Sequence, residues 1–474
     1  MSLNSFFGLS ARRPLFGSDQ AVAGRVSQRL GSARAQVSRA ICASALALLA
    51  SAASPIPALA AATADAPRLA GHELRFDAAG NLLPWIDWNT ALDREMRFYE
   101  TAPLDHGYPV FVTTTFLDGN WKPTERDDTI PATQNAAGIL SYLKFYALRG
   151  KHNPRTLAIA RAMGDYLIEQ DLTPASGPYP RFPHSTGRRQ HFPQPADSGS
   201  QNDRPYEIQP DKGALAGYAL LRLYDATGEK KYLDMSRHIA DVLAKNQIDG
   251  DATHSPWPFR VDTRNGEARG PVSGNLVFAL RLYDELVARG DIQFKPKRDA
   301  LWRWIKQTQI PSAAGNGALF AQFFEDHDNP ANRTAWAPLS LARYLLEKRS
   351  ALDPDWRADA KTLIDFVRRD MTHVEFGVRV CHEQDEDHDA WGGVNSTYGA
   401  VLAMYAKATG SSELAREARA ALNFAAYAID EQGRARDLPT HAELGGWQED
   451  AHTDVIHNFV DAIEAYPDWA ASMR

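Results

Sequence analysis

A helical pattern recurs along the sequence at an interval of roughly sixty residues, and this repeat limits the possible folds more than any other feature. Each unit begins with a predicted apolar helix and continues with an amphipathic one. The predicted apolar helices start near residues 135, 212, 272, 332, 394 and 452. The segments YLKFYALRGKHNPRTLAIARAMGDYL, YALLRLYDATGEKKYLDMSRHIADVL and AVLAMYAKATGSSELAREARAALNFA share one pattern. Stacked units of this kind bury a continuous apolar layer.

The apolar helices outnumber their amphipathic partners by one. The predicted pairs are 135–150 with 154–170, 212–228 with 231–247, 272–290 with 298–308, 332–349 with 355–369 and 394–410 with 413–430, followed by a single apolar helix at 452–466. An early amphipathic helix at 88–100 is left to cover the last one. A chain that supplies its own missing partner in this way closes a ring and leaves no terminal repeat exposed.

This arrangement resembles the six-hairpin glycosidase superfamily, the (α/α)6 toroids of many glycoside hydrolases and polysaccharide lyases. The resemblance rests on the repeat count, on the alternation of apolar and amphipathic helices, and on acidic and aromatic loops before the apolar helices. It implies an all-α fold with six parallel inner helices around a central funnel, in a single catalytic domain at 84–474. The alternative is an open α-solenoid that serves as a sugar-binding scaffold, but a scaffold does not need such chemically loaded loops.

The first sixty residues differ from the rest of the chain. Six arginines in this region precede an apolar run, ICASALALLASAASPIPALAAA, which ends near an A-x-A site at Ala58 to Ala60. The pattern predicts an export signal at 1–60 and a linker at 61–83, and so a periplasmic or secreted protein without a membrane partner after cleavage. An uncleaved anchor is the alternative. The formal charge of -7 argues against a nucleic-acid partner, because no basic stripe is present to neutralise phosphates.

The most reactive-looking stretch runs from Cys381 to Gly410. Almost every residue from His382 to Asp389 is Asp, Glu or His, and this loop opens into an apolar helix beside Trp391. Cys381 is interpreted as a small packing residue, since no Cys/His motif accompanies it. In a six-hairpin ring this loop is the fifth of six that gather at one end of the inner helices, so its residues are to be judged together with those of the other loops.

Glycoside hydrolysis needs two carboxyl groups beside the scissile bond, and crowded carboxylates raise the pKa of one of them. The candidates for this pair are Asp128, Glu207, Asp211, Glu386 and Asp450. Each of them has a structural alternative as an N-cap or a salt-bridge partner, above all Asp211 and Asp450. The sequence does not decide which of the five act or which is the acid.

The same loops supply the predicted substrate-binding side chains. They are Tyr206, His254, Trp257, Asn275, Arg333, His382, Trp391, Trp447 and His452. Aromatic faces stack on sugar rings, and basic residues such as Arg333 suit an acidic saccharide, although salt bridges to neighbouring acids explain them equally well. The expected substrate is therefore a uronic-acid-containing oligo- or polysaccharide.

Other chemistries use the same residue types. A polysaccharide lyase needs a Tyr or His base and an Arg or Asn that neutralises the uronate, and the candidates for these roles are Tyr206, His254, His382, His452, Arg333 and Asn275. An epimerase or isomerase of similar build would also use His or Tyr. The acidic loops contain metal-ligand types but no spacing such as H-E-x-x-H, so we expect neither a metal nor a cofactor.

Overall fold

The computed structural model describes residues 67–113, 130–185, 206–325, 329–435 and 454–470. Residues 65–474 form one compact unit. The predicted export signal lies outside the described residues, as do the candidates Asp128, Trp447, Asp450 and His452. Within the described part of the chain, no helix has both the length and the apolar character needed to cross a membrane.

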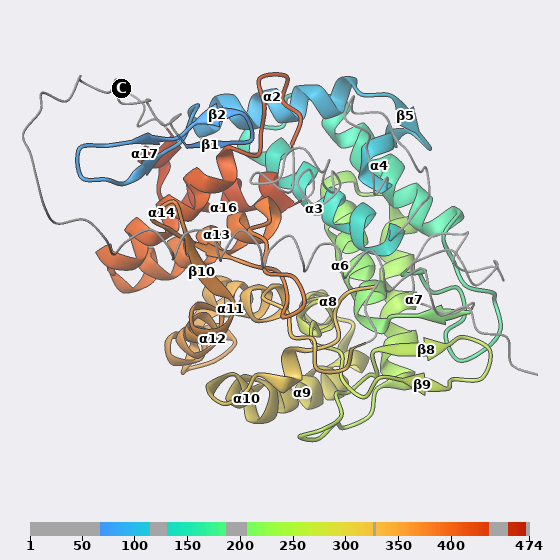
Figure 1. The fold of residues 1–474 in the computed structure, drawn as a ribbon. Coiled ribbons are helices and arrows are strands. Elements are labelled where there is room, and N and C mark those ends of the chain that lie inside the picture. The colour runs from blue at the N-terminus through green and yellow to red at the C-terminus, as the bar shows by residue number, and fades with distance from the viewer. Residues whose placement is uncertain (1–66, 114–129, 186–205, 326–328, 436–453, 471–474) are drawn as a thin grey trace, which may run out of the picture. The chain divides into compact units, whose positions relative to one another are not determined.

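Six helices form an inner ring in the order in which they occur along the chain (Figure 1). They are α3 (Pro131–Leu148), α6 (Pro210–Thr227), α8 (Val277–Ala288), α11 (Trp336–Lys348), α13 (Gly392–Thr409) and α16 (Ile456–Ala465). Each one packs against the next, and α16 packs against α3, so the ring is closed. The predicted (α/α)6 toroid is confirmed.

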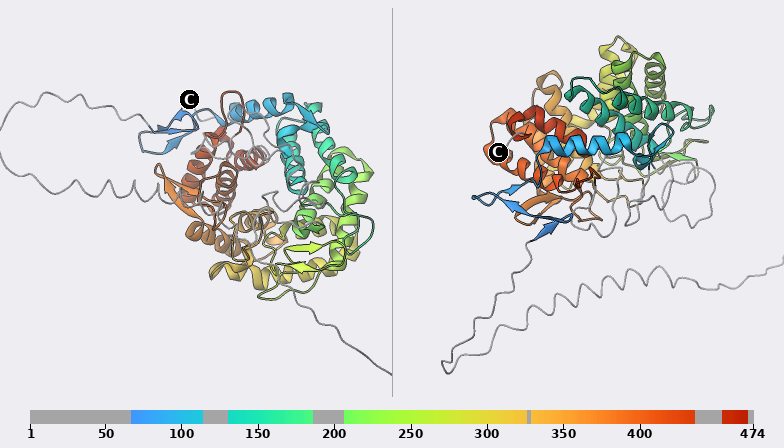
Figure 2. Two further views of the ribbon diagram at one scale, coloured as in Figure 1. Left: turned by 45° about the vertical axis from the view of Figure 1, so that its right-hand side comes forward. Right: turned by 90° about the horizontal axis from the view of Figure 1, so that it is seen from above.

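A second set of helices covers the inner ring from outside (Figure 2). It consists of α4 (Pro154–Glu169), α7 (Lys230–Asn246), α9 (Lys295–Trp304), α12 (Trp356–Asp370), α14 (Ser412–Ala426) and the early helix α2 (Trp88–Thr101). Each of the first five packs on the inner helix that precedes it, whereas α2 packs on α16. The early helix therefore supplies the last outer partner, as the repeat predicts.

Short turns join the inner helices to their outer partners, and their residues show why each helix ends. Gly228 and Gly410 close α6 and α13 in the left-handed conformation that glycine adopts without strain. The side chain of Asn153 caps α4 by accepting a hydrogen bond from the backbone N–H of Arg155. Because these turns are compact, successive inner helices run in the same direction.

One outer helix is irregular. After α9 the chain makes a π-helical segment at Ile305–Gln309 and continues as α10 (Ile310–Ala314). Pro311 lies in this second part, and a proline inside a helix removes one backbone hydrogen bond and crowds the preceding turn. The wider segment just before the proline accommodates this defect, so the outer layer remains continuous.

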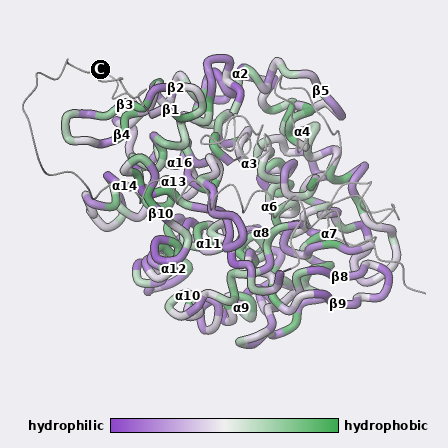
Figure 3. The backbone as a smooth tube through the Cα atoms, viewed as in Figure 1, coloured by the Kyte–Doolittle hydropathy of each residue, from purple (hydrophilic) through white to green (hydrophobic). Residues whose placement is uncertain are grey.

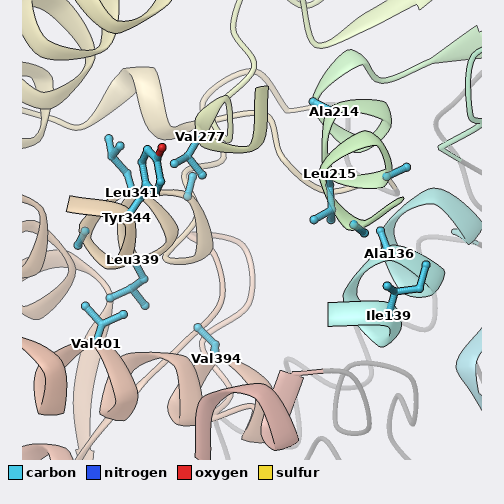
Figure 4. Packing of buried hydrophobic residues seen from close by; sticks show 14 of the residues in the cluster. Ala136, Ile139, Ala214, Leu215, Val277, Leu339, Leu341, Tyr344, Val394 and Val401 are labelled. Atoms are coloured by element: carbon cyan, nitrogen blue, oxygen red, sulfur yellow. The ribbon is translucent and has the colours of Figure 1, made fainter. Parts of the chain in front are cut away.

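The core lies between and within the two layers of helices. Hydrophobic residues recur along the helices, while the connecting segments are mainly hydrophilic (Figure 3). Side chains of neighbouring inner helices interlock, for example Leu339 of α11 with the α13 residues around Val401 (Figure 4). Gly399 of α13 allows a close approach to α14, since a Cβ atom there would lie 2.6 Å from Leu422. Small residues on the inner helices thus set how tightly the two layers pack.

Short strands lie in several of the segments that lead into the inner helices. The strands β7 (Glu207–Ile208), β8 (Arg260–Asp262) and β9 (Ala268–Arg269) form one antiparallel sheet, and β10 (Thr372–Glu375) pairs with β11 (Val378–Cys381). A further small hairpin, β5 (Leu104–Asp105) with β6 (Tyr108–Pro109), follows α2. These strands fix the loops that carry the candidate site.

The segment expected to be a linker is part of the domain from residue 68 onward. Two hairpins, β1 (Arg68–Leu69) with β2 (His72–Glu73) and β3 (Arg75–Phe76) with β4 (Leu82–Leu83), share a small apolar cluster with Val378 and Phe424. Asn423 donates a hydrogen bond to the carbonyl of Leu82. The linker prediction for this stretch is wrong, because Leu69, Leu74 and Leu82 bury their side chains instead of facing solvent.

Candidate functional site

The segments that precede different inner helices meet at one end of the ring. Thr133, in the first turn of α3, donates a hydrogen bond to Glu325, which lies before α11, over 2.6 Å. Arg260 of β8 donates to the main-chain oxygen of Glu325 at 2.8 Å. Further along, Arg333 binds Asp385 at 2.8 Å, so the segments before α11 and α13 also touch. Residues far apart in sequence therefore become neighbours at the N-terminal ends of the inner helices.

Five side chains at this end form what we call the Lys212 cluster: Thr133, Asp211, Lys212, Phe323 and Glu325. The ammonium Nζ of Lys212 lies 3.7 Å from Oδ2 of Asp211 and 3.7 Å from Oε1 of Glu325. It also lies 3.3 Å from the centre of the Phe323 ring, within the range of a cation–π interaction. Two carboxyl groups thus flank a single buried cation.

The carboxyl group of Asp211 is buried and has no hydrogen-bond partner. It is 2% exposed, and neither of its carboxyl oxygens accepts a well-formed hydrogen bond. Burial raises the pKa of Asp211 to about 6, against the opposing charge of Lys212 and with a further increase from Glu325. A carboxyl group with such a pKa exchanges its proton close to neutral pH, which is the property of a general acid or base.

The local sequence explains why Asp211 is placed in this way. Pro210 occupies the first turn of α6, where its missing N–H costs no hydrogen bond, and Asp211 follows it. No side chain caps this helix, so the N-cap alternative for Asp211 is wrong. Gly213 then lets α6 lie against Phe182, because a Cβ atom there would be 2.0 Å from that ring. The start of α6 is therefore held deep in the structure.

An aromatic pair lies next to the second carboxylate. The rings of Phe323 and Phe324 are 4.9 Å apart and nearly perpendicular, and both residues are partly exposed. The ammonium of Lys212 faces Phe323. Aromatic side chains beside carboxyl groups are a common surface for sugar rings, which present flat C–H faces between their hydroxyl groups.

The other nominated carboxylates serve different purposes. Glu207 forms a two-point ion pair with Arg269, which joins β7 to β9. Glu386 is exposed and accepts a hydrogen bond from Asn329 at 2.7 Å. Neither contact links these groups to the Lys212 cluster. Of the three nominated carboxylates that the structure describes, Asp211 alone belongs to the cluster.

Two of the predicted substrate-binding side chains have structural roles. Trp257 is fully buried, and its indole N–H donates to the carbonyl of Leu243 at 3.1 Å. It therefore presents no free face to a sugar, and this prediction is wrong. Arg333 is held by ion pairs to Asp385 and Asp370 at 2.8 and 2.7 Å, so the salt-bridge explanation of this residue applies rather than recognition of an acidic sugar.

Two further candidates lie in turns. The guanidinium of Arg264 lies 4.2 Å from the centre of the Tyr206 ring. His254 is exposed in a turn where its backbone N–H and its ring both contact Asp251. No contact between described residues joins either side chain to the Lys212 cluster.

Asn275, His382 and Trp391 lie in the segments that precede inner helices, and two of them have unpaired buried atoms. Asn275 is 6% exposed with no partner for its side-chain oxygen, and His382 is 3% exposed with none for either ring nitrogen. Burial lowers the pKa of His382 to about 4, with further decreases from His388, which stacks on it at 4.5 Å, and from His373. Trp391 donates to Asp387 at 2.9 Å.

The described residues contain no group of three or more His, Cys, Asp or Glu side chains arranged to hold a metal ion. Cys381 is buried, as a packing residue would be, and burial raises the pKa of its thiol.

Comparison with known proteins identifies the fold. No protein-family model matches the sequence, and no curated protein matches it. The chain is similar in structure to a sugar epimerase from a ruminal bacterium, with a TM-score of 0.55, 14% identity, and coverage of 79% of this chain and 97% of that one. It is similar to the cellobiose 2-epimerase from Spirochaeta thermophila, with a TM-score of 0.56, 13% identity, and coverage of 79% and 94%.

A third similar structure is a family 76 glycoside hydrolase from a bovine Bacteroides thetaiotaomicron strain, with a TM-score of 0.51, 10% identity, and coverage of 81% and 78%. These neighbours are (α/α)6 toroid enzymes, in agreement with the resemblance to the six-hairpin glycosidase superfamily. At these identities the likeness establishes the fold and leaves the reaction to be argued from the site.

Sequence reasoning missed most of the Lys212 cluster. Lys212, Phe323 and Glu325 lie in the loops that were singled out, but none of the three was a candidate. The available signal was the run FFED shortly before the fourth inner helix, in which two aromatic residues precede two acids. The contact of this run with the start of α6 follows from ring closure and has no local sequence signature.

Proposed function

We propose that this protein is a carbohydrate-active enzyme that hydrolyses glycosidic bonds, with Asp211 and Glu325 as its pair of carboxyl groups. The observation that carries the proposal is the placement of both carboxyl groups 3.7 Å from the Nζ atom of Lys212 at the N-terminal end of the inner helices. Glycoside hydrolysis requires such a pair, one group protonated and the other ionised.

The surroundings of the two groups support a different role for each. Asp211 is the acid, because burial raises its pKa to about 6 and its proton is available near neutral pH. Glu325 is the carboxylate, because a hydroxyl group and an ammonium group both face it. Asp211 donates its proton to the glycosidic oxygen as the bond to the anomeric carbon breaks. Glu325 activates the water that completes the reaction, or attacks the anomeric carbon before water releases the product.

The charges of the Lys212 cluster bear on whether the substrate is acidic. Arg333 is committed to two aspartates, and Arg260 contacts the main chain of Glu325. With Asp211 protonated, Lys212 and Glu325 balance each other, so the cluster has no surplus positive charge to attract a uronate. Neutral saccharides therefore belong in any substrate panel beside the uronic-acid-containing ones.

The decisive experiment incubates the purified protein with neutral and uronic-acid oligosaccharides and measures both new reducing ends and ultraviolet absorbance. We expect new reducing ends without a change in absorbance, and we expect Asp211→Asn and Glu325→Gln to abolish them. New absorbance would indicate a lyase, which needs a Tyr or His base with an Arg or Asn. Among the described residues, no hydrogen bond or ion pair joins a candidate base (Tyr206, His254 or His382) to Arg333 or Asn275, and Arg333 is paired with Asp370 and Asp385.

A second candidate is proton transfer at the carbon next to a sugar carbonyl, as in an epimerase or isomerase. The observation that favours it is the raised pKa of Asp211, since a group that exchanges protons near neutrality also suits this reaction. Two of the similar structures are sugar epimerases. Incubation of reducing sugars in D2O distinguishes the two reactions, because proton transfer incorporates deuterium into carbon and hydrolysis does not.

A further inference from the structure

Lys212 differs from the other buried or half-buried lysines in how it meets carboxylates. It is 2% exposed and its ammonium donates no hydrogen bond. Lys306 lies 3.0 Å from Asp353, and Lys348 lies 3.0 Å from Glu285, which are ordinary ion-pair distances. Lys212 instead lies 3.7 Å from each of two carboxyl groups. Its ammonium therefore forms a close ion pair with neither carboxyl group.

The ring of Phe323 accounts for this intermediate position. Its centre lies 3.3 Å from the Lys212 ammonium, so the ring attracts the cation through its negative face. Thr133 meanwhile holds the same Glu325 oxygen that lies nearest to Lys212. The Phe323 ring attracts the ammonium, and the Glu325 oxygen already accepts a hydrogen bond from Thr133. Together these contacts keep the ammonium of Lys212 between the two carboxyl groups.

We propose that Lys212 is a positioning residue, a counter-ion shared by Asp211 and Glu325 and held between them by Phe323 so that negative charge can move from one carboxyl group to the other during catalysis. This inference rests on the proposed roles of the two carboxyl groups. It adds a function for Lys212 that neither the fold nor the choice of substrate implies.

The charges explain why a shared counter-ion is useful. Before the reaction Glu325 is ionised and Asp211 carries the proton. After Asp211 has donated that proton, and Glu325 has taken one from the attacking water, the negative charge is on Asp211. The net charge of the cluster stays the same. Lys212 lies as close to Asp211, which now carries the negative charge, as it does to Glu325, which carried it before. A buried carboxylate without such a partner would be costly to form.

The charged side chains that act on Asp211 are Lys212 and Glu325, and Glu325 is in turn held by groups from two further elements. Lys212 belongs to α6 with Asp211 itself, Glu325 comes from the segment before α11, Thr133 comes from α3, and Arg260 of β8 contacts the main chain of Glu325. Of these, Lys212 and Glu325 act on the titration of Asp211 in opposite directions. Removal of Lys212 therefore leaves Asp211 with Glu325 as its charged neighbour, which raises the pKa of Asp211 further.

The test measures thermal unfolding between pH 3 and pH 9 and needs no substrate. In the wild type, the contribution of Asp211 to stability falls as pH rises from its unfolded-state pKa to its folded-state pKa, because the folded protein holds the proton more tightly. We expect Lys212→Met to move the upper end of this window upward by about 1 to 3 pH units, since it removes an opposite charge. Lys212→Arg should largely restore the wild-type position.

Phe323→Leu tests the positioning by the ring, with Phe324→Leu as its matched control. We expect the Phe323 variant to shift the window and the Phe324 variant to leave it in place, because Lys212 lies over the first ring. Should Lys212→Met fail to fold, the Phe323 pair answers the same question. An unchanged window in Lys212→Met, or in Phe323→Leu, would overturn the proposal.

Activity provides a second reading once a substrate is known. Loss of the shared counter-ion should lower kcat more than it changes KM and should move the basic limb of the pH profile upward. If no saccharide is turned over but the unfolding window shifts as described, the proposed reaction fails while the shared counter-ion stands. If hydrolysis occurs and the window does not move, the counter-ion role fails while the reaction stands.

Discussion

The pKa values of two buried aspartates in the same ring are shifted in opposite directions. Asp211 lies at the start of α6 with one cation and one acid beside it, and its pKa is raised to about 6. Asp461 lies in the middle of α16. Burial opposes its ionisation, yet Lys144, then Arg343 and His457, hold the pKa of Asp461 well below its usual range. Burial is common to both sites, so the number and sign of the neighbouring charges decide the outcome.

The two sites also differ in what they do for the fold. Asp461 joins inner helices, because Lys144 belongs to α3 and Arg343 to α11, and Arg343 lies 3.5 Å from its carboxylate. Asp211 joins nothing by a hydrogen bond. A buried carboxyl group that has no hydrogen-bond partner, and whose ionised form is costly to bury, is better explained by chemistry than by structure. This contrast can be tested by changing one site at a time.

The largest effect is expected from Asp211→Asn on turnover. If Asp211 is the general acid, its loss lowers kcat by roughly 10²- to 10⁴-fold, the usual contribution of a proton donor. The melting temperature should not fall, since the amide removes an ionisable group that is costly to bury. Initial rates and thermal unfolding at pH 7 check both parts. A variant that melts well below the wild type would place Asp211 in the same structural class as Asp461.

The next largest effect is expected from Asp461→Asn on stability. Removal of one partner from a buried ion pair leaves Lys144 and Arg343 without compensation and costs about 3 to 5 kcal/mol of unfolding free energy. Denaturant unfolding measures this cost. The double variant Lys144→Met with Asp461→Leu should recover part of it, because it removes charges of both signs.

A somewhat smaller effect is expected from pH alone. Asp211 has a raised pKa in the folded state, so its contribution to stability is fully present below about pH 4 and is lost as pH rises toward 6. The shift corresponds to about 3 kcal/mol at most. The difference between wild type and Asp211→Asn, followed by unfolding across this range, isolates the effect. A difference that did not vary with pH would contradict the raised pKa.

The smallest effect is expected from Glu386→Gln. This carboxylate is exposed and accepts a hydrogen bond that a glutamine can also accept, so the unfolding free energy should change by less than about 0.5 kcal/mol. Activity should stay close to that of the wild type. A large loss of activity would indicate that the reactive centre is the acidic loop before α13 and not the Lys212 cluster.

The fold was predictable because its signal is local and repeated. Apolar and amphipathic helices alternate within each unit, and the glycines at 228 and 410 mark helix ends that occur in the structure. The short strands were not predicted, since pairs such as β7 with β8 consist of two or three residues each. The hairpins at 68–83 were missed because their burial depends on α14, which lies more than three hundred residues away in sequence.

The candidate site was predictable only in part. The loops were identified because one set of helix starts is rich in acids and aromatic residues, and Asp211 was among the candidates. The choice of Glu325 as its partner depends on contacts between segments that are far apart in sequence, which residue types alone do not specify. Trp257 shows the reverse error, since a tryptophan in a loop can complete the core as readily as it can meet a ligand.

The seam between α3 and α16 has a consequence for how the chain folds. Lys144 and Asp461 are 317 residues apart in sequence, while the other neighbours in the inner ring follow one another along the chain. Successive hairpins can therefore assemble early, but the ring closes only when its last inner helix docks, and closing such a long loop is slow. Until then an open stack exposes apolar faces of α3 and α13. We expect this late step to limit refolding and to be the stage most prone to aggregation.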